Sequence, residues 1–223
     1  MILKPHTRYV CLDIGNVLCH TNFQSFLNKL SKTLNISLDD AMYFMNRTQK
    51  LHDLGLTVMA DELRDHFKIH SPLIIEELQD AWNNVVTPHF RIIDLLTRLR
   101  DKDNLQVALL SNIGIEHAEQ IKDKLSHNMF FFYAKKHFSC EVGARKPSML
   151  YYQSFLSIHP EFKGCVYVDD LQENLDASEQ FGFKTFKFNL KDYFGEDVSV
   201  ITSDNNLKLH EKIKELEELI LKQ

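Results

Sequence analysis

Acidic side chains follow two apolar runs that are typical of buried strands. Asp13 comes directly after Tyr9-Val-Cys-Leu, and the pair Asp169-Asp170 follows Cys165-Val-Tyr-Val. Adjacent carboxylates raise each other's pKa unless a cation lies between them. Mg²⁺ is a hard cation that takes carboxylate oxygens together with substrate phosphate oxygens. These residues therefore predict a site in which Mg²⁺ holds a phosphorylated small molecule against carboxylates.

A serine and a lysine supply the other groups that phosphoryl transfer needs. Ser111-Asn112 follows the apolar run 105–110, and Lys146 stands in Arg145-Lys-Pro before a predicted helix. Asp13 can act as a carboxylate nucleophile that forms an aspartyl-phosphate. Lys146 and Mg²⁺ would neutralise the phosphoryl oxygens, which is the main electrostatic task in this chemistry. The Ser111 hydroxyl, expected at the start of a helix, would hydrogen-bond one of these oxygens.

Strands and helices alternate along most of the chain, which indicates how these groups are brought together. The predicted strands span residues 9–13, 105–110, 137–140, 165–168 and 183–188, and the predicted helices span 92–100, 116–125, 148–157 and 174–181. Such alternation predicts an α/β fold with a Rossmann-like parallel sheet core and helices on both faces. Ligands of such sheets bind at the carboxyl ends of the strands.

Residues 22–86 follow a helical pattern, without a convincing strand. Apolar residues recur there at three- and four-residue steps, Ser37 can cap a helix, Gly55 can end it, and Ser71-Pro72 can open another. Because this block follows the first sheet strand, we expect a small α-helical bundle cap inserted at that point. The predicted domains are a catalytic core of residues 1–20 and 88–223 and a cap of residues 21–87.

Composition limits the classes of partner. The 223 residues carry a net charge of −5 with scattered basic residues, so we expect no nucleic-acid partner. No apolar run is long enough to span a bilayer, and residues 1–8 are short and polar, without the apolar core of a signal peptide. The four cysteines have no metal-ligand spacing and suit reduced buried thiols. We therefore expect a cytoplasmic protein without a membrane partner.

The C-terminal residues 207–221 predict a charged amphipathic helix. Leu209, Ile213, Leu216 and Ile220 share one stripe of it. Such a stripe packs on its own domain or forms a contact with a second copy, so monomer and homodimer both remain open.

Four sequence pieces occur in a set order: Asp13-x-Gly-Asn-Val, Ser111-Asn, Lys146-Pro and Asp169-Asp-x-x-x-Asn174. Over residues 8–190 they resemble the four motifs of the haloacid-dehalogenase superfamily, and the cap placement is similar to that of members with a small helical cap of the C1 type. Within the superfamily, the chain most resembles the branch of bacterial α-D-glucose-1-phosphate phosphatases. It resembles them in the Gly-Asn of the first motif, in a histidine at His117 and in the Arg-Lys-Pro triplet.

The resemblance implies a set of site residues. Asp13, Asp170 and the backbone carbonyl of Gly15 would bind Mg²⁺ directly, and Asp169 would act through a water. The catalytic residues would be Asp13, Lys146 and Ser111, and the phosphate- or substrate-binding residues Ser111, Asn112, Gly15, Asn16, Lys146 and His20. In the predicted cap, His52, Asp53, Trp82 and Asn83 are candidates to contact the substrate.

Gly15 departs from the general pattern of the superfamily. Most of its phosphatases carry a second Asp at this position, which protonates the leaving group and later activates water. The loss of an acid/base typically costs about 10² to 10⁴ in rate. The branch that this chain resembles has the same glycine, so either the substrate has a good leaving group or another residue substitutes; His20 is the nearest candidate by sequence.

The leading hypothesis is a Mg²⁺-dependent phosphomonoesterase that acts on a small phosphorylated metabolite such as a sugar phosphate. A dehalogenase is an alternative, since halide departure needs no acid at Gly15, but that branch manages without Mg²⁺ and usually lacks the pair Asp169-Asp170. A third hypothesis, from a different class, is a non-catalytic binding or regulatory protein that kept the fold and lost turnover.

Overall fold

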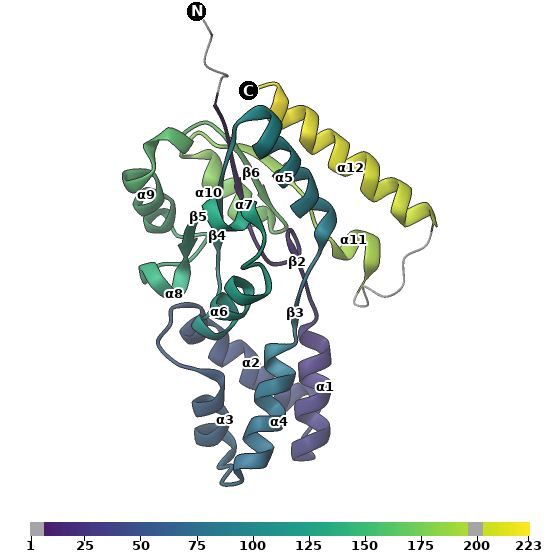
Figure 1. Ribbon diagram of the computed structural model, residues 1–223. Coiled ribbons are helices and arrows are strands. Elements are labelled where there is room, and N and C mark those ends of the chain that lie inside the picture. Colours follow the sequence, from purple (N-terminus) through teal and green to yellow (C-terminus); the bar gives the residue numbers. More distant parts are fainter. Residues whose placement is uncertain (1–6, 196–202) are drawn as a thin grey trace, which may run out of the picture.

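A sheet of five parallel strands forms the centre of the protein (Figure 1). Its strands lie in the order β5-β4-β1-β6-β7 and span Lys135–Phe138, Leu105–Ser111, Arg8–Leu12, Val166–Asp169 and Lys184–Lys187. The computed structural model describes residues 7–195 and 203–223, so most of the polar N-terminal segment discussed above lies outside the described residues. The predicted α/β class with a Rossmann-like parallel core is confirmed.

The two faces of the sheet bury alternate residues of each strand, as the period of two in a strand requires. In β1, Val10 and Leu12 belong to one apolar cluster and Cys11 to the other. The first cluster also contains buried residues of α5 (Phe90–Asp103) and α6 (Ile115–Lys124). The second contains buried residues of α9 (Met149–Ile158) and α10 (Gln172–Glu179). Because both faces are covered, the strands read as nearly continuous apolar runs in the sequence.

Four helices lie beyond the carboxyl ends of the strands, at the opposite end of the molecule from the C-terminus (Figure 1). They are α1 (Phe23–Leu34), α2 (Leu38–Asp53), α3 (Met59–Phe67) and α4 (Pro72–Asn83), and we call them the helical cap. The Ser37 hydroxyl accepts a hydrogen bond from the Asp40 amide at the start of α2, and Pro72 is the first residue of α4. The domain boundaries predicted at residues 20/21 and 87/88 stay predictions.

Several short elements differ from the sequence-based expectation. A two-stranded antiparallel ribbon, β2 (Cys19–Thr21) with β3 (Val86–Pro88), connects the core with the helical cap. The strand expected at 137–140 ends at Phe138, because residues 139–142 form the short helix α8 (Ser139–Val142). Helices α7 (Met129–Tyr133) and α11 (Lys191–Phe194) and the 3₁₀ turn η1 (Pro160–Phe162) were not predicted. Runs of three to five residues are too short for a periodic signal.

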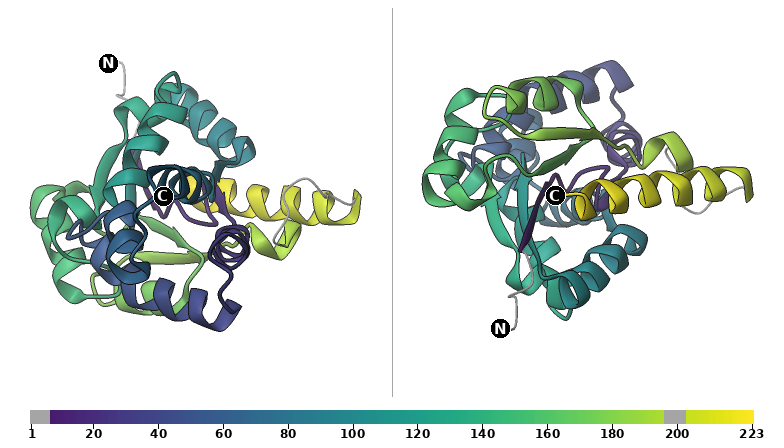
Figure 2. Two further views of the ribbon diagram at one scale, coloured as in Figure 1. Left: turned by 90° about the horizontal axis from the view of Figure 1, so that it is seen from below. Right: turned by 90° about the horizontal axis from the view of Figure 1, so that it is seen from above.

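The C-terminal helix α12 (Ser203–Leu221) packs along the core and projects beyond it (Figure 2). It contacts β1, α5 and α11, and Leu209, Leu216 and Ile220 of its apolar stripe have no exposed surface. Three of the four stripe residues are therefore covered within the chain, and Ile213 is partly buried. None of the helices in the described residues is both long and apolar enough to cross a membrane.

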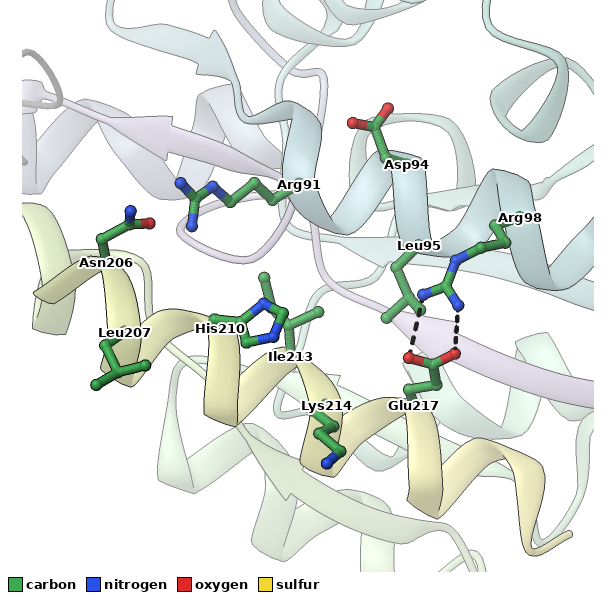
Figure 3. A pocket seen from close by; sticks show the side chains of 10 residues that line it. All are labelled: Arg91, Asp94, Leu95, Arg98, Asn206, Leu207, His210, Ile213, Lys214 and Glu217. Carbon is green, nitrogen blue, oxygen red and sulfur yellow. Dashed lines mark hydrogen bonds and ion pairs between the residues drawn. The ribbon is translucent and has the colours of Figure 1, made fainter. Parts of the chain in front are cut away.

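A groove of about 980 Å³ lies between the exposed sides of α5 and α12 (Figure 3). At one end Arg98 donates to both carboxylate oxygens of Glu217, at 2.6 and 3.1 Å. Exposed ion pairs of this kind contribute about 0–1 kcal/mol to stability. None of the residues lining the groove is among the predicted site residues.

Candidate active site

The predicted catalytic groups meet at the carboxyl edge of the sheet. Asp13 follows the last residue of the central strand β1, and Ser111 and Asp169 are the last residues of the neighbouring strands β4 and β6. The Asp13 amide donates to the Val168 carbonyl at 2.8 Å, which ties the end of β1 to the end of β6. Parallel pairing thus brings together three residues that are far apart along the chain.

Lys146 is the buried cation of this cluster. Only 1% of it is exposed, and its Nζ lies 3.1 Å from Asp13 Oδ1 and 2.7 Å from Asp169 Oδ2. The side chain of Asn112 donates to the Lys146 carbonyl at 2.9 Å and accepts from the Lys146 amide at 2.8 Å. Asn112, predicted to bind phosphate or substrate, therefore uses both ends of its amide to hold the backbone of the lysine.

Asp169 organises the loop that follows β6. Its Oδ1 accepts from the Leu171 amide and from Asn174 Nδ2, each at 2.9 Å. Its Oδ2 accepts from Lys146 and from the Tyr167 hydroxyl, and the residue has no exposed surface. With both oxygens engaged by protein donors, this carboxylate is better suited to positioning Lys146 than to binding a metal directly.

The carboxylates of Asp13, Asp169 and Asp170 fit a divalent cation. One oxygen of each lies within 4.8 Å of the others, and all three residues form the cluster at the base of the site. Burial raises the pKa of Asp13 to about 7, and the charges of Asp169 and Asp170 add to this, while Lys146 and a hydrogen bond from Ser111 oppose it. Burial also raises the pKa of Asp170. One ammonium group cannot balance three buried carboxylates, and an all-oxygen donor set matches Mg²⁺.

Asn16 ties the first motif to the fourth. Its backbone is left-handed, with φ 51°, and its Nδ2 donates to Asp170 Oδ2 at 3.1 Å. Its Oδ1 accepts from the amide and the hydroxyl of Thr21, at 3.2 and 2.8 Å. The side chain that we predicted to bind substrate thus holds Asp170 in place.

Two further residues lie elsewhere than the sequence indicated. The His20 ring is buried and its Nε2 lies 3.0 Å from the Gly195 carbonyl, and His20 does not line the cavity above Asp13. Ser111 is not a helix cap, because α6 begins at Ile115 with Gly114 as its N-cap. The Ser111 side chain lies instead beside Asp13, where it acts to lower the pKa of that carboxyl.

A cavity of about 250 Å³ lies between this edge of the sheet and the helical cap. Of the predicted site residues, Asp13, Gly15, Asn16, Asn112, Lys146 and Asp170 line it. The helical cap contributes Phe23, Gln49, His52, Asp53 and Trp82. His52, Asp53 and Trp82 were expected to contact the substrate from sequence; Asn83, the fourth candidate, is not among the lining residues.

Polar contacts close the helical cap onto the core at this cavity. Arg145 donates to the Asp53 carboxylate at 2.9 Å, and Ser139 Oγ donates to the Asp53 carbonyl at 2.5 Å. The Glu116 carboxylate contacts three of the cap helices. Sequence reasoning missed Glu116, and it named Arg145 as part of the third motif without giving it a role.

His117 is a buried ring at the same junction. It is 4% exposed, its Nε2 lies 3.0 Å from the Trp82 carbonyl, and its ring centroid is 4.4 Å from that of Trp82. Burial is the largest cause that lowers the pKa of His117 to about 4. The ring is therefore neutral at neutral pH and fastens α4 to α6.

Acid should loosen this junction through His117. A group with a lowered pKa in the folded state is protonated first in the unfolded state, so its contribution to stability is complete above about pH 6.5 and is lost as the pH falls toward 4. The loss amounts to about 3 kcal/mol. In urea unfolding between pH 7 and 4, His117→Gln should lose correspondingly less free energy of unfolding than the native chain. Equal losses in the two proteins would show that His117 does not contribute to the acid sensitivity.

Comparison with solved structures shows which proteins share this fold. No protein-family model matches the sequence, and no curated protein matches it. Among solved structures, a HAD family enzyme from Bacteroides thetaiotaomicron superposes with a TM-score of 0.70 at 20% identity, covering 81% of this chain and 92% of that one. The same enzyme has been solved in complex with magnesium and inorganic phosphate.

Two other similar structures are a hydrolase and a dehalogenase. A predicted HAD-like family hydrolase from Porphyromonas gingivalis has a TM-score of 0.65 at 20% identity, covering 82% of this chain and 91% of that one. An L-2-haloacid dehalogenase has a TM-score of 0.58 at 14% identity, covering 93% and 100%. The chain therefore has the fold of the HAD enzymes, and phosphate-binding and dehalogenating proteins both share it.

Proposed function

We propose that this chain is a Mg²⁺-dependent hydrolase of phosphoric monoesters in which Asp13 is the nucleophile. The observation that carries the proposal is the position of Lys146 Nζ, within 3.1 Å of Asp13 and 2.7 Å of Asp169, in a buried cluster of three carboxylates. A dianionic phosphoryl group needs positive charge beside the nucleophile, which Lys146 and a divalent cation held by the carboxylates would supply together. The magnesium and phosphate bound to the similar Bacteroides enzyme support the same reading.

Each residue of the cluster has a separate task. Asp13 attacks the phosphorus, Lys146 and the Ser111 hydroxyl stabilise the phosphoryl oxygens, and Asp169 holds Lys146. Asp13 and Asp170 would hold the metal, with the carbonyl of Gly15 beside them on the cavity wall. A bound Mg²⁺ would supply positive charge that neutralises the phosphoryl oxygens.

The cavity limits the substrate to a small molecule. A volume of about 250 Å³ is of the size that a phosphoryl group with a sugar-sized leaving group would need. We further propose that the helical cap is a small cap of the C1 type. We also propose that the substrate is a sugar phosphate, as for the α-D-glucose-1-phosphate phosphatases.

A dehalogenase is the second candidate, favoured by Gly15 and by the similar dehalogenase structures. One observation weighs against it. The pair Asp169 and Asp170 adds buried negative charge that a reaction without a metal would have to tolerate.

Product release from a substrate panel decides between these functions. The purified protein is incubated with sugar phosphates, nucleotides, an aryl phosphate and 2-haloacids, with Mg²⁺ and with EDTA, and phosphate and halide are measured. We expect phosphate release that requires Mg²⁺. Halide release that is insensitive to EDTA would assign the dehalogenase. The absence of both products, with Mg²⁺ still raising the thermal unfolding temperature, would favour a binding protein on this fold.

A further inference from the structure

The glycine at position 15 is not required by the backbone. A Cβ at Gly15 would meet only Thr21 Cγ2, at 3.6 Å, which is ordinary van der Waals contact. A Cβ is therefore accommodated at the position where most phosphatases with the motifs that this chain resembles carry their acid. Since sterics do not explain the glycine, the proton for the leaving group must come from another side chain if unactivated esters are hydrolysed.

The position of the nucleophile limits where that side chain can lie. In phosphoryl transfer the attacking and leaving oxygens are roughly in line, so the leaving oxygen lies on the side of the phosphorus away from Asp13. That side is the wall of the cavity formed by the helical cap. Among the residues that line the cavity, this wall contributes two titratable side chains, His52 and Asp53. Asp53 is already paired with Arg145 at 2.9 Å.

His52 is held by a carboxylate of the core. Its Nε2 lies 2.6 Å from Glu116 Oε2, and 2% of the residue is exposed. Glu116 also accepts from the Met59 amide at 3.1 Å and from Gln79 at 2.7 Å. Burial raises the pKa of Glu116, but these hydrogen bonds and the His52 ring outweigh burial and keep that pKa below its usual value. An ionised Glu116 makes Nε2 the donor, which leaves Nδ1 as the nitrogen that exchanges its proton.

The surroundings place the ring at the junction of cap and core. His52 lies across Gly114, where a Cβ would overlap the imidazole, and its edge faces Trp82 at a centroid distance of 5.0 Å. The charged and titratable groups around it are Glu116 and His117 on α6, Asp53 on its own helix, and Arg145 beside Asp53. In the described residues Nδ1 makes no hydrogen bond with the protein. Because His52 lines the cavity, we infer that Nδ1 is the nitrogen that meets a ligand there.

Resting on the proposed phosphatase function, we propose that His52 replaces the acid missing at Gly15 and that Glu116 is its positioning residue. Asp13 attacks the phosphorus, the bond from phosphorus to the ester oxygen breaks with its electron pair on that oxygen, and His52 Nδ1 protonates it to release the alcohol. Water then attacks the aspartyl-phosphate and gives its proton to the neutral His52. The bond between phosphorus and the Asp13 oxygen breaks, its electron pair returns to the Asp13 carboxylate, and phosphate leaves.

Substrates with different leaving groups test this assignment. Glycerol phosphate releases an alkoxide that needs the proton, whereas p-nitrophenyl phosphate releases a stable phenolate that does not. For His52→Gln we expect kcat/KM to fall by about 10² or more on glycerol phosphate and by less than about fivefold on p-nitrophenyl phosphate. His70→Gln, an exposed histidine between α3 and α4, is the matched control and should leave both rates unchanged.

Rescue and pH dependence separate catalysis from a structural role. Gly15→Asp in the His52→Gln background should restore the glycerol phosphate rate at least tenfold. Glu116→Gln should move the alkaline limb of the kcat/KM profile to lower pH, because the imidazolium loses its counter-charge. Equal losses on both substrates without rescue would overturn the assignment of His52, even for a variant that folds poorly, since a loss of folded protein affects both rates alike. If the native chain hydrolyses neither ester, the phosphatase proposal itself fails.

Discussion

Asp13→Asn is expected to abolish phosphate release while leaving the fold intact. The amide is isosteric with the carboxylate but cannot attack phosphorus, so we expect a loss of roughly 10⁴-fold or more in kcat. The free energy of unfolding without metal should not fall at pH 8. Burial raises the pKa of Asp13 to about 7, so above that pH the ionised side chain costs stability that a neutral amide does not.

Intact-protein mass spectrometry after an acid quench checks the same prediction directly. The native chain should carry one phosphoryl group during turnover, and Asp13→Asn should carry none. Asp94→Asn, an exposed aspartate on α5, serves as the control and should behave as the native chain does. If Asp13→Asn keeps its rate within a factor of ten, the nucleophile is another group and the aspartyl-phosphate mechanism is wrong.

Lys146→Met is expected to impair both activity and folding. The methionine has a similar length but leaves Asp13 and Asp169 without their cation, at 3.1 and 2.7 Å in the native chain. Removal of one partner of a buried ion pair typically costs about 3–5 kcal/mol, because the remaining charge stays buried and unpaired. Activity should fall by about 10²- to 10³-fold, the usual effect of losing one group that stabilises transition-state charge.

Urea unfolding with and without Mg²⁺ measures the stability part. The deficit of Lys146→Met should be largest at pH 8 without metal and should shrink on addition of Mg²⁺, since the ion restores positive charge to the cluster. Lys163→Met, at an exposed position after the 3₁₀ turn, is the control and should change little. A Lys146→Met protein with native stability at pH 8 would contradict the view that this lysine compensates the buried carboxylates.

The parallel sheet could be predicted because its signal is local. Apolar runs of four to six residues, each ending in a polar residue, marked β1, β4 and β6, and the helices between them followed the expected period. The same local signal placed Asp13 and Asp169 at the edge where parallel strands end. The expected strand at 137–140 was wrong in its second half, where Ser139 begins α8 and its hydroxyl bonds to residues of two other segments.

The contents of the cavity wall could be predicted only in part. His52, Asp53 and Trp82 were candidates because they lie in the predicted cap, but the pairing of His52 with Glu116 spans 64 positions. His20 was a candidate substitute acid because of its nearness to Gly15 in the sequence, and its ring instead contacts the Gly195 carbonyl. Nearness along the chain is a poor guide here, because side chains alternate across the two faces of a strand such as β2.

By itself, the sequence determined the kinds of group available and their places: Asp13, Ser111 and the pair Asp169 and Asp170 at strand ends, and Lys146 before a helix. Only the tertiary structure decided what each group contacts. It committed Asn112 and Asn16 to holding Lys146 and Asp170, and it brought His52 of the helical cap against Glu116 of the core. The physical reason is that periodicity and propensity act over a few residues, whereas the docking of the cap depends on the shape and burial of whole surfaces.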